Sequence, residues 1–105
     1  MTGSAESGQG AHSESEQVER LKQYLLDIAR PMVDERNQSS LYVEVKKGAE
    51  GGVLLRLRGD RECIRYLVGK DGVVARSMRR MVKGVAKAIS YRHMVEVRVG
   101  DPPVA

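Results

Sequence analysis

The chain has 105 residues, 41% of them hydrophobic, and a formal net charge of +4. This length predicts one small domain, and no stretch is apolar enough to predict a membrane span or a secretory signal. The single cysteine, Cys63, excludes an internal disulfide and is expected to act as a small core residue. The expected location is therefore cytoplasmic.

The charge is unevenly distributed along the chain. Residues 1–16 carry three acidic side chains and no Lys or Arg, whereas residues 59–92 carry nine basic and three acidic side chains, a balance of +6. Such a basic block indicates a polyanionic partner. A solvated helix face produces the same pattern, so the block alone leaves both interpretations open.

Composition divides the chain into three regions. Residues 1–13 are rich in Ser, Gly and Glu and are expected to form a disordered N-terminal tail. Residues 14–100 form the predicted domain, and residues 101–105 form a C-terminal tail. Because the chain has no Trp or Phe, Val, Leu, Ile and Met must fill the core.

The first predicted element is a long helix. Ser13 and Glu16 form a capping-box pattern at its start, and Pro31 should kink or end it near Arg30, because proline has no N–H to donate. The spacing of its apolar residues also suits a coiled-coil seam, but the repeat covers too few heptads for one. We therefore expect a helix that lies on a sheet. The predicted inner face consists of Val18, Leu21, Leu25, Ile28, Ala29 and Met32.

Three strands are predicted after a polar connection at residues 34–40. Residues 41–46 and 53–58 alternate between apolar and polar side chains, and the glycine-rich residues 47–52 between them predict a hairpin turn. Residues 94–99 form the third strand. The inward side chains are expected to be Leu41, Val43, Val45, Val53, Leu55, Leu57, Val95, Val97 and Val99.

Two helices are predicted between the second and third strands. Asp60 can cap a short helix at residues 61–68, and a longer helix spans residues 72–90. The predicted apolar face of the longer helix consists of Val74, Ala75, Met78, Met81, Val82, Val85 and Ile89. The opposite face, expected to be free to contact a ligand, carries Arg76, Arg79, Arg80, Lys83 and Lys87.

The predicted order of elements is α-β-β-α-α-β. Each strand has one apolar face and each long helix has one apolar stripe. This combination predicts an α+β fold with two layers, in which a three-stranded sheet is covered by three helices on one face.

A short loop, Gly69-Lys70-Asp71-Gly72, joins the last two helices. Glycine brings no Cβ to hold a ligand away, and the unpaired N–H groups that open the second helix favour an anion. Lys70 adds a full positive charge. The loop therefore predicts a phosphate site, although a helix–helix turn that needs glycine for its geometry gives the same four residues.

This order of elements, with G-x-x-G between the second and third helices, resembles the type II KH domain, and in particular the small bacterial single-KH proteins of the KhpA type. The resemblance implies an RNA-binding protein that holds single-stranded RNA, or less often single-stranded DNA, and acts as an RNA chaperone or post-transcriptional regulator. The RNA-binding residues that it implies, with two added from helix geometry (Arg80 and Lys83), are Gly69, Lys70, Asp71, Gly72, Arg76, Arg79, Arg80 and Lys83.

The sequence departs from the family at three positions. Asp71 places a carboxylate in the loop, and Val73 and Val74 stand where relatives tend to have a basic and a hydroxyl residue. Some phosphate contacts are therefore expected to be weakened or absent.

An alternative hypothesis is a KH-fold module for protein interaction or dimerisation, with weak or no nucleic-acid binding. The resemblance implies a homodimer, or a heterodimer with a KhpB (Jag-type) KH protein. Phosphate binding would weaken with salt and an apolar interface would not. An RRM-like reader is disfavoured, because Tyr42 is the single aromatic residue on the outward sheet positions.

No enzyme, metal or cofactor is predicted. No acidic pair is placed by spacing, and the glycine spacing differs from that of a Walker loop. His93 is expected to be a solvated turn residue without a partner.

Overall fold

The structure, a computed structural model, describes residues 13–100. Both predicted tails, except Ser13, lie outside the described residues. The elements, in chain order, are the helices and strands α2 (Glu14–Ala29), η1 (Arg30–Met32), α3 (Glu35–Gln38), β1 (Tyr42–Lys47), η2 (Ala49–Gly51), β2 (Val53–Arg58), α4 (Arg61–Val68), η3 (Lys70–Gly72), α5 (Val73–Ala88) and β3 (Val95–Val99), where η marks a 3-10 helix.

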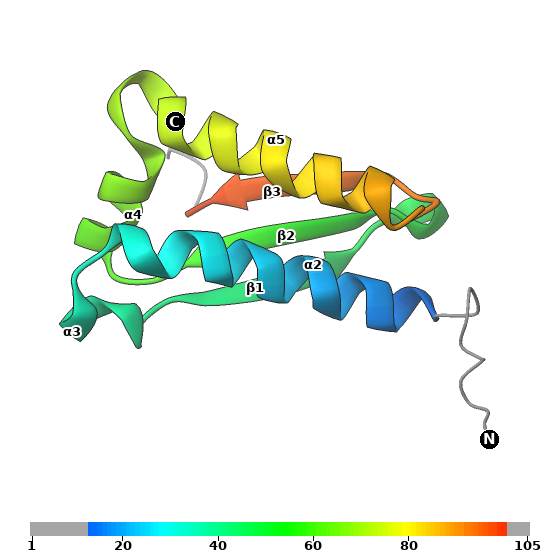
Figure 1. Cartoon of the computed structure of the whole chain (residues 1–105), viewed down its shortest axis with the longest axis horizontal. Coiled ribbons are helices and arrows are strands. Elements are labelled where there is room, and N and C mark those ends of the chain that lie inside the picture. Colours follow the sequence, from blue (N-terminus) through cyan, green and yellow to red (C-terminus); the bar gives the residue numbers. More distant parts are fainter. Residues whose placement is uncertain (1–12, 101–105) are drawn as a thin grey trace.

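The three strands form one mixed sheet in the order β1-β2-β3, with β1 antiparallel and β3 parallel to β2. Helices α2 and α5 lie side by side across one face of this sheet, and α4 lies near one end of it (Figure 1). The prediction of an α+β fold with a three-stranded sheet is confirmed. The predicted polar connection contains a further short helix, α3, which the sequence pattern did not indicate.

The core lies between the sheet and the two long helices. The register places Val45 opposite Leu55 and Leu55 opposite Val97, so one apolar row crosses all three strands. Leu21 and Leu25 of α2 pack against this face and are fully buried. Cys63 is also buried in this cluster and is a free thiol, as expected of a core cysteine.

Helix α2 begins and ends where its sequence predicts. The hydroxyl of Ser13 accepts a hydrogen bond from the amide of Glu16 at 3.2 Å, and the Glu16 carboxylate accepts one from the Ser13 amide at 3.1 Å. The helix ends at Ala29 and Pro31 lies in η1, because proline does not continue the α-helical hydrogen bonds. The expectation that Met32 belongs to the inner face is wrong, since Met32 lies beyond this change of helix type and is 37% exposed.

Two predictions for the later helices need correction. Asp60 precedes α4, but its side chain accepts no capping hydrogen bond; its own amide instead donates to the Ser40 hydroxyl at 3.4 Å. Met81 is 44% exposed, whereas Met78, Val82 and Ala86 are buried. Met81 lies at the margin of the apolar stripe, because the sheet covers only the centre of that stripe.

His93 has a partner, contrary to the prediction from sequence. Its Nε2 lies 2.7 Å from Oε2 of Glu14, the first residue of α2. Nearby, the Gln17 side-chain amide donates to the Ile89 carbonyl at 2.9 Å. Burial, and secondarily the Glu14 charge, raises the pKa of the Tyr91 phenol above its usual value of 10.0, so folding favours the neutral phenol. The contribution of this neutral phenol to stability is therefore present below pH 10.0 and is lost as the pH rises through the raised pKa.

These contacts join the start of α2 to the segment between α5 and β3. Replacing His93 with alanine is expected to lower the free energy of unfolding by about 0.5–1.5 kcal/mol, the usual net value of one hydrogen bond. Urea denaturation at neutral pH measures the change. The Glu14→Ala variant should lose a similar amount, and the double variant should lose little more than either single one, because both changes remove the same contact. Fully additive losses would contradict the pairing.

Candidate nucleic-acid interface

The loop between α4 and α5 has a backbone that requires glycine. Gly69 ends α4 with φ 77° and ψ 173°, a region that essentially only glycine occupies. Gly72 precedes α5 with φ 74° and ψ 16°. Between them Asp71 is also left-handed, with φ 56° and ψ 24°, a conformation that Asp tolerates better than most residues. Three of the four loop residues thus have positive φ.

The amides of this loop are only partly available to a ligand. The Gly69 amide donates to the Arg65 carbonyl at 3.2 Å, the Gly72 amide to the Gly69 carbonyl at 3.1 Å, and the Val73 amide to the Lys70 carbonyl. The expectation that the amides opening α5 are unpaired is therefore wrong for Gly72 and Val73, because the tight turn uses them itself. Among residues 13–100, no hydrogen bond involves the amides of Lys70 and Asp71.

The basic residues of the first turns of α5 differ in what they contact. One guanidinium nitrogen of Arg76 donates to the Asp71 carbonyl at 2.7 Å, and this hydrogen bond stabilises the loop. The other N–H groups of Arg76 have no hydrogen-bond partner among residues 13–100. Lys70, Arg80 and Lys83 are exposed. These side chains place positive charge at the loop and along one side of α5, and the helix dipole adds to it at the first turn of α5.

Arg79 differs from the other cations. Its Nε donates to the Val97 carbonyl of β3 at 3.0 Å, and its side chain is half-buried. Arg79 is therefore held to β3 through Nε, and its two terminal nitrogens have no hydrogen-bond partner among residues 13–100. On the helical wheel Arg79 lies next to the buried stripe, which brings it within reach of the outer edge of the sheet.

Replacing Arg79 with alanine is expected to lower the free energy of unfolding by about 1–2 kcal/mol, because a hydrogen bond from a charged donor to the β3 edge is lost. The matched change Arg80→Ala should alter stability by less than about 0.5 kcal/mol, as expected for an exposed position. Chemical denaturation of both variants measures the difference. Equal stability of the two variants would show that the hydrogen bond from Arg79 to β3 does not stabilise the fold.

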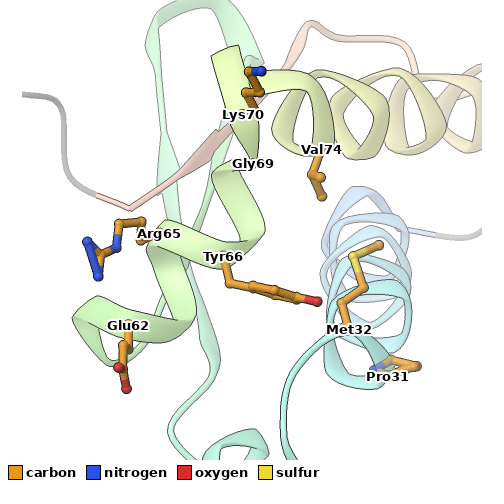
Figure 2. Close-up of a pocket in the computed structure, with 8 residues that line it drawn as sticks. All are labelled: Pro31, Met32, Glu62, Arg65, Tyr66, Gly69, Lys70 and Val74. Atoms are coloured by element: carbon orange, nitrogen blue, oxygen red, sulfur yellow. The ribbon is translucent and has the colours of Figure 1, made fainter.

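A pocket of about 890 Å³ opens beside the loop (Figure 2). Its walls come from η1, α4, the loop and the first turn of α5, and its lining residues are Pro31, Met32, Glu62, Arg65, Tyr66, Gly69, Lys70 and Val74. Figure 2 shows the Tyr66 ring extending from α4 towards Met32. Tyr66 was not among the residues predicted from the sequence to bind RNA, although it lies only three residues before Gly69.

Comparison with solved structures identifies a similar fold. One is a crystal structure of Era in complex with MgGDPNP and nucleotides 1506–1542 of 16S ribosomal RNA, with a TM-score of 0.53 and 16% identity over 79% of this chain. Another, an Era variant from Aquifex aeolicus bound to GDP and aluminium fluoride, has a TM-score of 0.51, also at 16% identity over 79% of this chain. The fold resembles part of Era.

The chain spans 30% and 31% of the length of these two Era chains. At this identity the likeness concerns the fold alone. Searches against protein-family models and curated proteins give no match.

Within residues 13–100 no three His, Cys, Asp or Glu side chains are grouped as a metal site would require. None of the helices in the same range is long and apolar enough to span a bilayer.

Proposed function

We propose that this chain is a non-enzymatic RNA-binding protein with a type II KH domain, similar to the small bacterial proteins of the KhpA type. The loop between α4 and α5 would hold the sugar–phosphate backbone of single-stranded RNA. The observation that carries the proposal is the pair of unused amides at Lys70 and Asp71, next to the exposed cations of α5.

The chemistry of this loop suits a phosphate better than a neutral ligand. A phosphate oxygen can accept hydrogen bonds from the two amides while Lys70 and Arg76 neutralise its charge. Gly72 has no Cβ, and a Cβ there would lie beside the exposed end of Arg76, so a ligand that contacts Arg76 can approach this backbone closely. Backbone contacts of this kind carry no sequence information, so we expect little sequence selectivity.

The structural relatives support the same class of ligand. One of the two Era structures was solved in complex with a fragment of 16S ribosomal RNA. A small protein with one short binding site is suited to weak and general contacts with RNA, and two copies would bind more tightly than one. We therefore propose a role as an RNA chaperone or post-transcriptional regulator in the cytoplasm.

The decisive experiment compares binding of single-stranded RNA by the wild type and Lys70→Asp. The variant is expected to bind at least about tenfold more weakly, because a charge-assisted phosphate contact worth about 1.5–3 kcal/mol becomes a repulsion. The control is Lys46→Asp, the same charge change at an exposed position of β1, which should bind as the wild type does. Equal binding by all three proteins, with folding verified, would refute the proposal.

A protein-interaction module is the second candidate. The apolar side chains of Val73, Met81 and Met94 are 52%, 44% and 80% exposed, so they are available to pack against another protein. A homodimer or a heterodimer with a KhpB-type KH protein would cover such side chains. Sedimentation over a range of protein and salt concentrations distinguishes this candidate, because an apolar interface should persist at high salt whereas phosphate binding should not.

A further inference from the structure

The sheet has a second face, which points away from α2 and α5. Its side chains alternate along each strand with those of the core, and no helix of residues 13–100 lies over it (Figure 1). The register arranges this outer sheet face in three rows across the strands, which are Lys46, Leu54 and Glu96, then Glu44, Arg56 and Arg98, and then Tyr42 and Arg58.

The cations of the outer sheet face are not fully satisfied by the chain itself. The Arg56 side chain is only 13% exposed, yet its Nη1 lies 3.9 Å from Glu44, and its Nε is buried without a hydrogen-bond partner among residues 13–100. Glu44 also accepts a hydrogen bond from Arg58 at 3.2 Å, so one carboxylate is shared by two guanidinium groups. Lys46 forms no ion pair in the same range. A further acidic group is therefore favourable here, because a guanidinium without acceptors is costly to bury.

An apolar hollow of about 360 Å³ lies at the hairpin end of the same face. The Gly48 amide donates to the Gly52 carbonyl at 2.8 Å there, and neither glycine has a side chain to fill the hollow. Met94 is 80% exposed at this hollow, and Leu54 is half-buried in it. Such a hollow can hold an apolar anchor side chain of a partner.

We propose that the outer sheet face docks an extended acidic segment of a partner protein. Apolar side chains of the segment pack on Leu54 and in the hollow beside Met94, and a carboxylate accepts hydrogen bonds from the Nη groups of Arg56 and Arg98. Met94 and Arg98 are about 13 Å apart along β3, the distance between the first and fifth residues of an extended segment. The surface does not involve the loop between α4 and α5, so it is independent of the proposed RNA binding.

The composition of this face favours a protein segment over RNA. Glu44 and Glu96 lie among the cations and would repel a phosphate backbone, which carries a charge at every nucleotide. Tyr42 is the single aromatic residue at the outward positions of the three strands, so platforms for base stacking are scarce. Met94 and Leu54 instead offer aliphatic surface, which suits aliphatic side chains of a protein.

The first test measures binding of two labelled peptides by fluorescence anisotropy. Their central sequences are Leu-Thr-Leu-Thr-Glu and the reverse, Glu-Thr-Leu-Thr-Leu, because an extended segment can run in either direction. At least one should bind the wild type, and its binding should weaken about 10- to 150-fold when glutamine replaces glutamate, the range for a hydrogen bond to a charged group. Failure of both peptides to bind, or equal binding of the glutamine peptide, would overturn the inference.

The second test locates the peptide with changes at exposed residues. Arg98→Glu and Met94→Ser should each weaken its binding at least about tenfold. The matched control is Arg20→Glu, the same charge reversal at an exposed position of α2, which should bind as the wild type does. Circular dichroism verifies that the three variants fold. Unchanged binding by either Arg98→Glu or Met94→Ser would overturn the inference, because the segment is expected to contact both residues.

Further measurements separate this surface from the RNA-binding loop. Lys70→Asp should bind the peptide, and Arg98→Glu should bind single-stranded RNA, as the wild type does. Weaker RNA binding by Arg98→Glu would assign the face to RNA, and self-association that Met94→Ser abolishes would assign it to a second copy of the chain; either result would overturn the inference. If Lys70→Asp does not weaken RNA binding, the proposed function is refuted and the docking surface stands.

Discussion

Replacing Gly69 with alanine is expected to lower the free energy of unfolding by about 3 kcal/mol or more. The backbone at φ 77° and ψ 173° costs any residue with a Cβ about 1–3 kcal/mol. In addition, a Cβ at this position would lie 2.6 Å from Cγ2 of Val74 and 3.1 Å from its backbone nitrogen. Overpacking of this kind adds about 1–3 kcal/mol. Urea denaturation, with unchanged m-values, measures the loss.

Gly72→Ala is the matched control for this prediction. Gly72 is also left-handed, but its Cβ would meet only the flexible end of Arg76, at 3.3 Å. Gly72→Ala should therefore lower the free energy of unfolding by less, about 1–2 kcal/mol. Adding Val74→Ala to Gly69→Ala should recover part of the stability by removing the clash. Equal losses at Gly69 and Gly72, with no recovery, would contradict the steric contribution of Val74.

Affinity for single-stranded RNA is expected to fall about 50-fold when the salt concentration rises from about 50 to about 200 mM. Each phosphate contact on a single strand contributes about −0.7 to the log–log slope. Four cations lie at the loop or along one side of α5, namely Lys70, Arg76, Arg80 and Lys83. Four phosphate contacts give a slope of about −2.8 by this rule. Fluorescence anisotropy over a salt series measures the slope.

Single substitutions test which side chains produce this slope. Arg80→Ala and Lys83→Ala should each reduce its magnitude by about 0.7. Arg79→Ala should leave the slope unchanged, because Arg79 already donates to the Val97 carbonyl. A slope near zero would exclude phosphate contacts, and a reduced slope in Arg79→Ala would mean that Arg79 leaves β3 for the RNA.

The boundaries of several elements could be predicted from the sequence because their signals are local. Strand β2 and helix α4 begin and end at the predicted residues, since alternation and Gly59–Asp60 mark them within a few positions. The capping box at Ser13 and the break at Pro31 act through neighbouring backbone groups and were likewise predicted. Helix α3 was missed because a single polar turn has no apolar period to detect.

The errors concern contacts between residues far apart in the chain. His93 and Glu14 are 79 positions apart, and Arg79 meets Val97 across the gap between a helix and a strand. A helical wheel gives the direction of Arg79 but not the strand edge beside it. Met81 has the same apolar character as Met78, and the packing of α5 against α2 and β3 buries Met78 but not Met81.

By itself the sequence determined the elements, their apolar faces and the glycine loop with its cations, because hydrophobic period, capping and glycine conformation act over a few residues. The tertiary structure alone decided which loop amides are unused and which arginine is held by the sheet, because these depend on how the turn and the layers pack. It also brought Tyr66 of α4 and Met32 of η1 to opposite sides of one pocket. No pattern along the chain relates these two residues, since their proximity arises only when α4 packs near the end of α2.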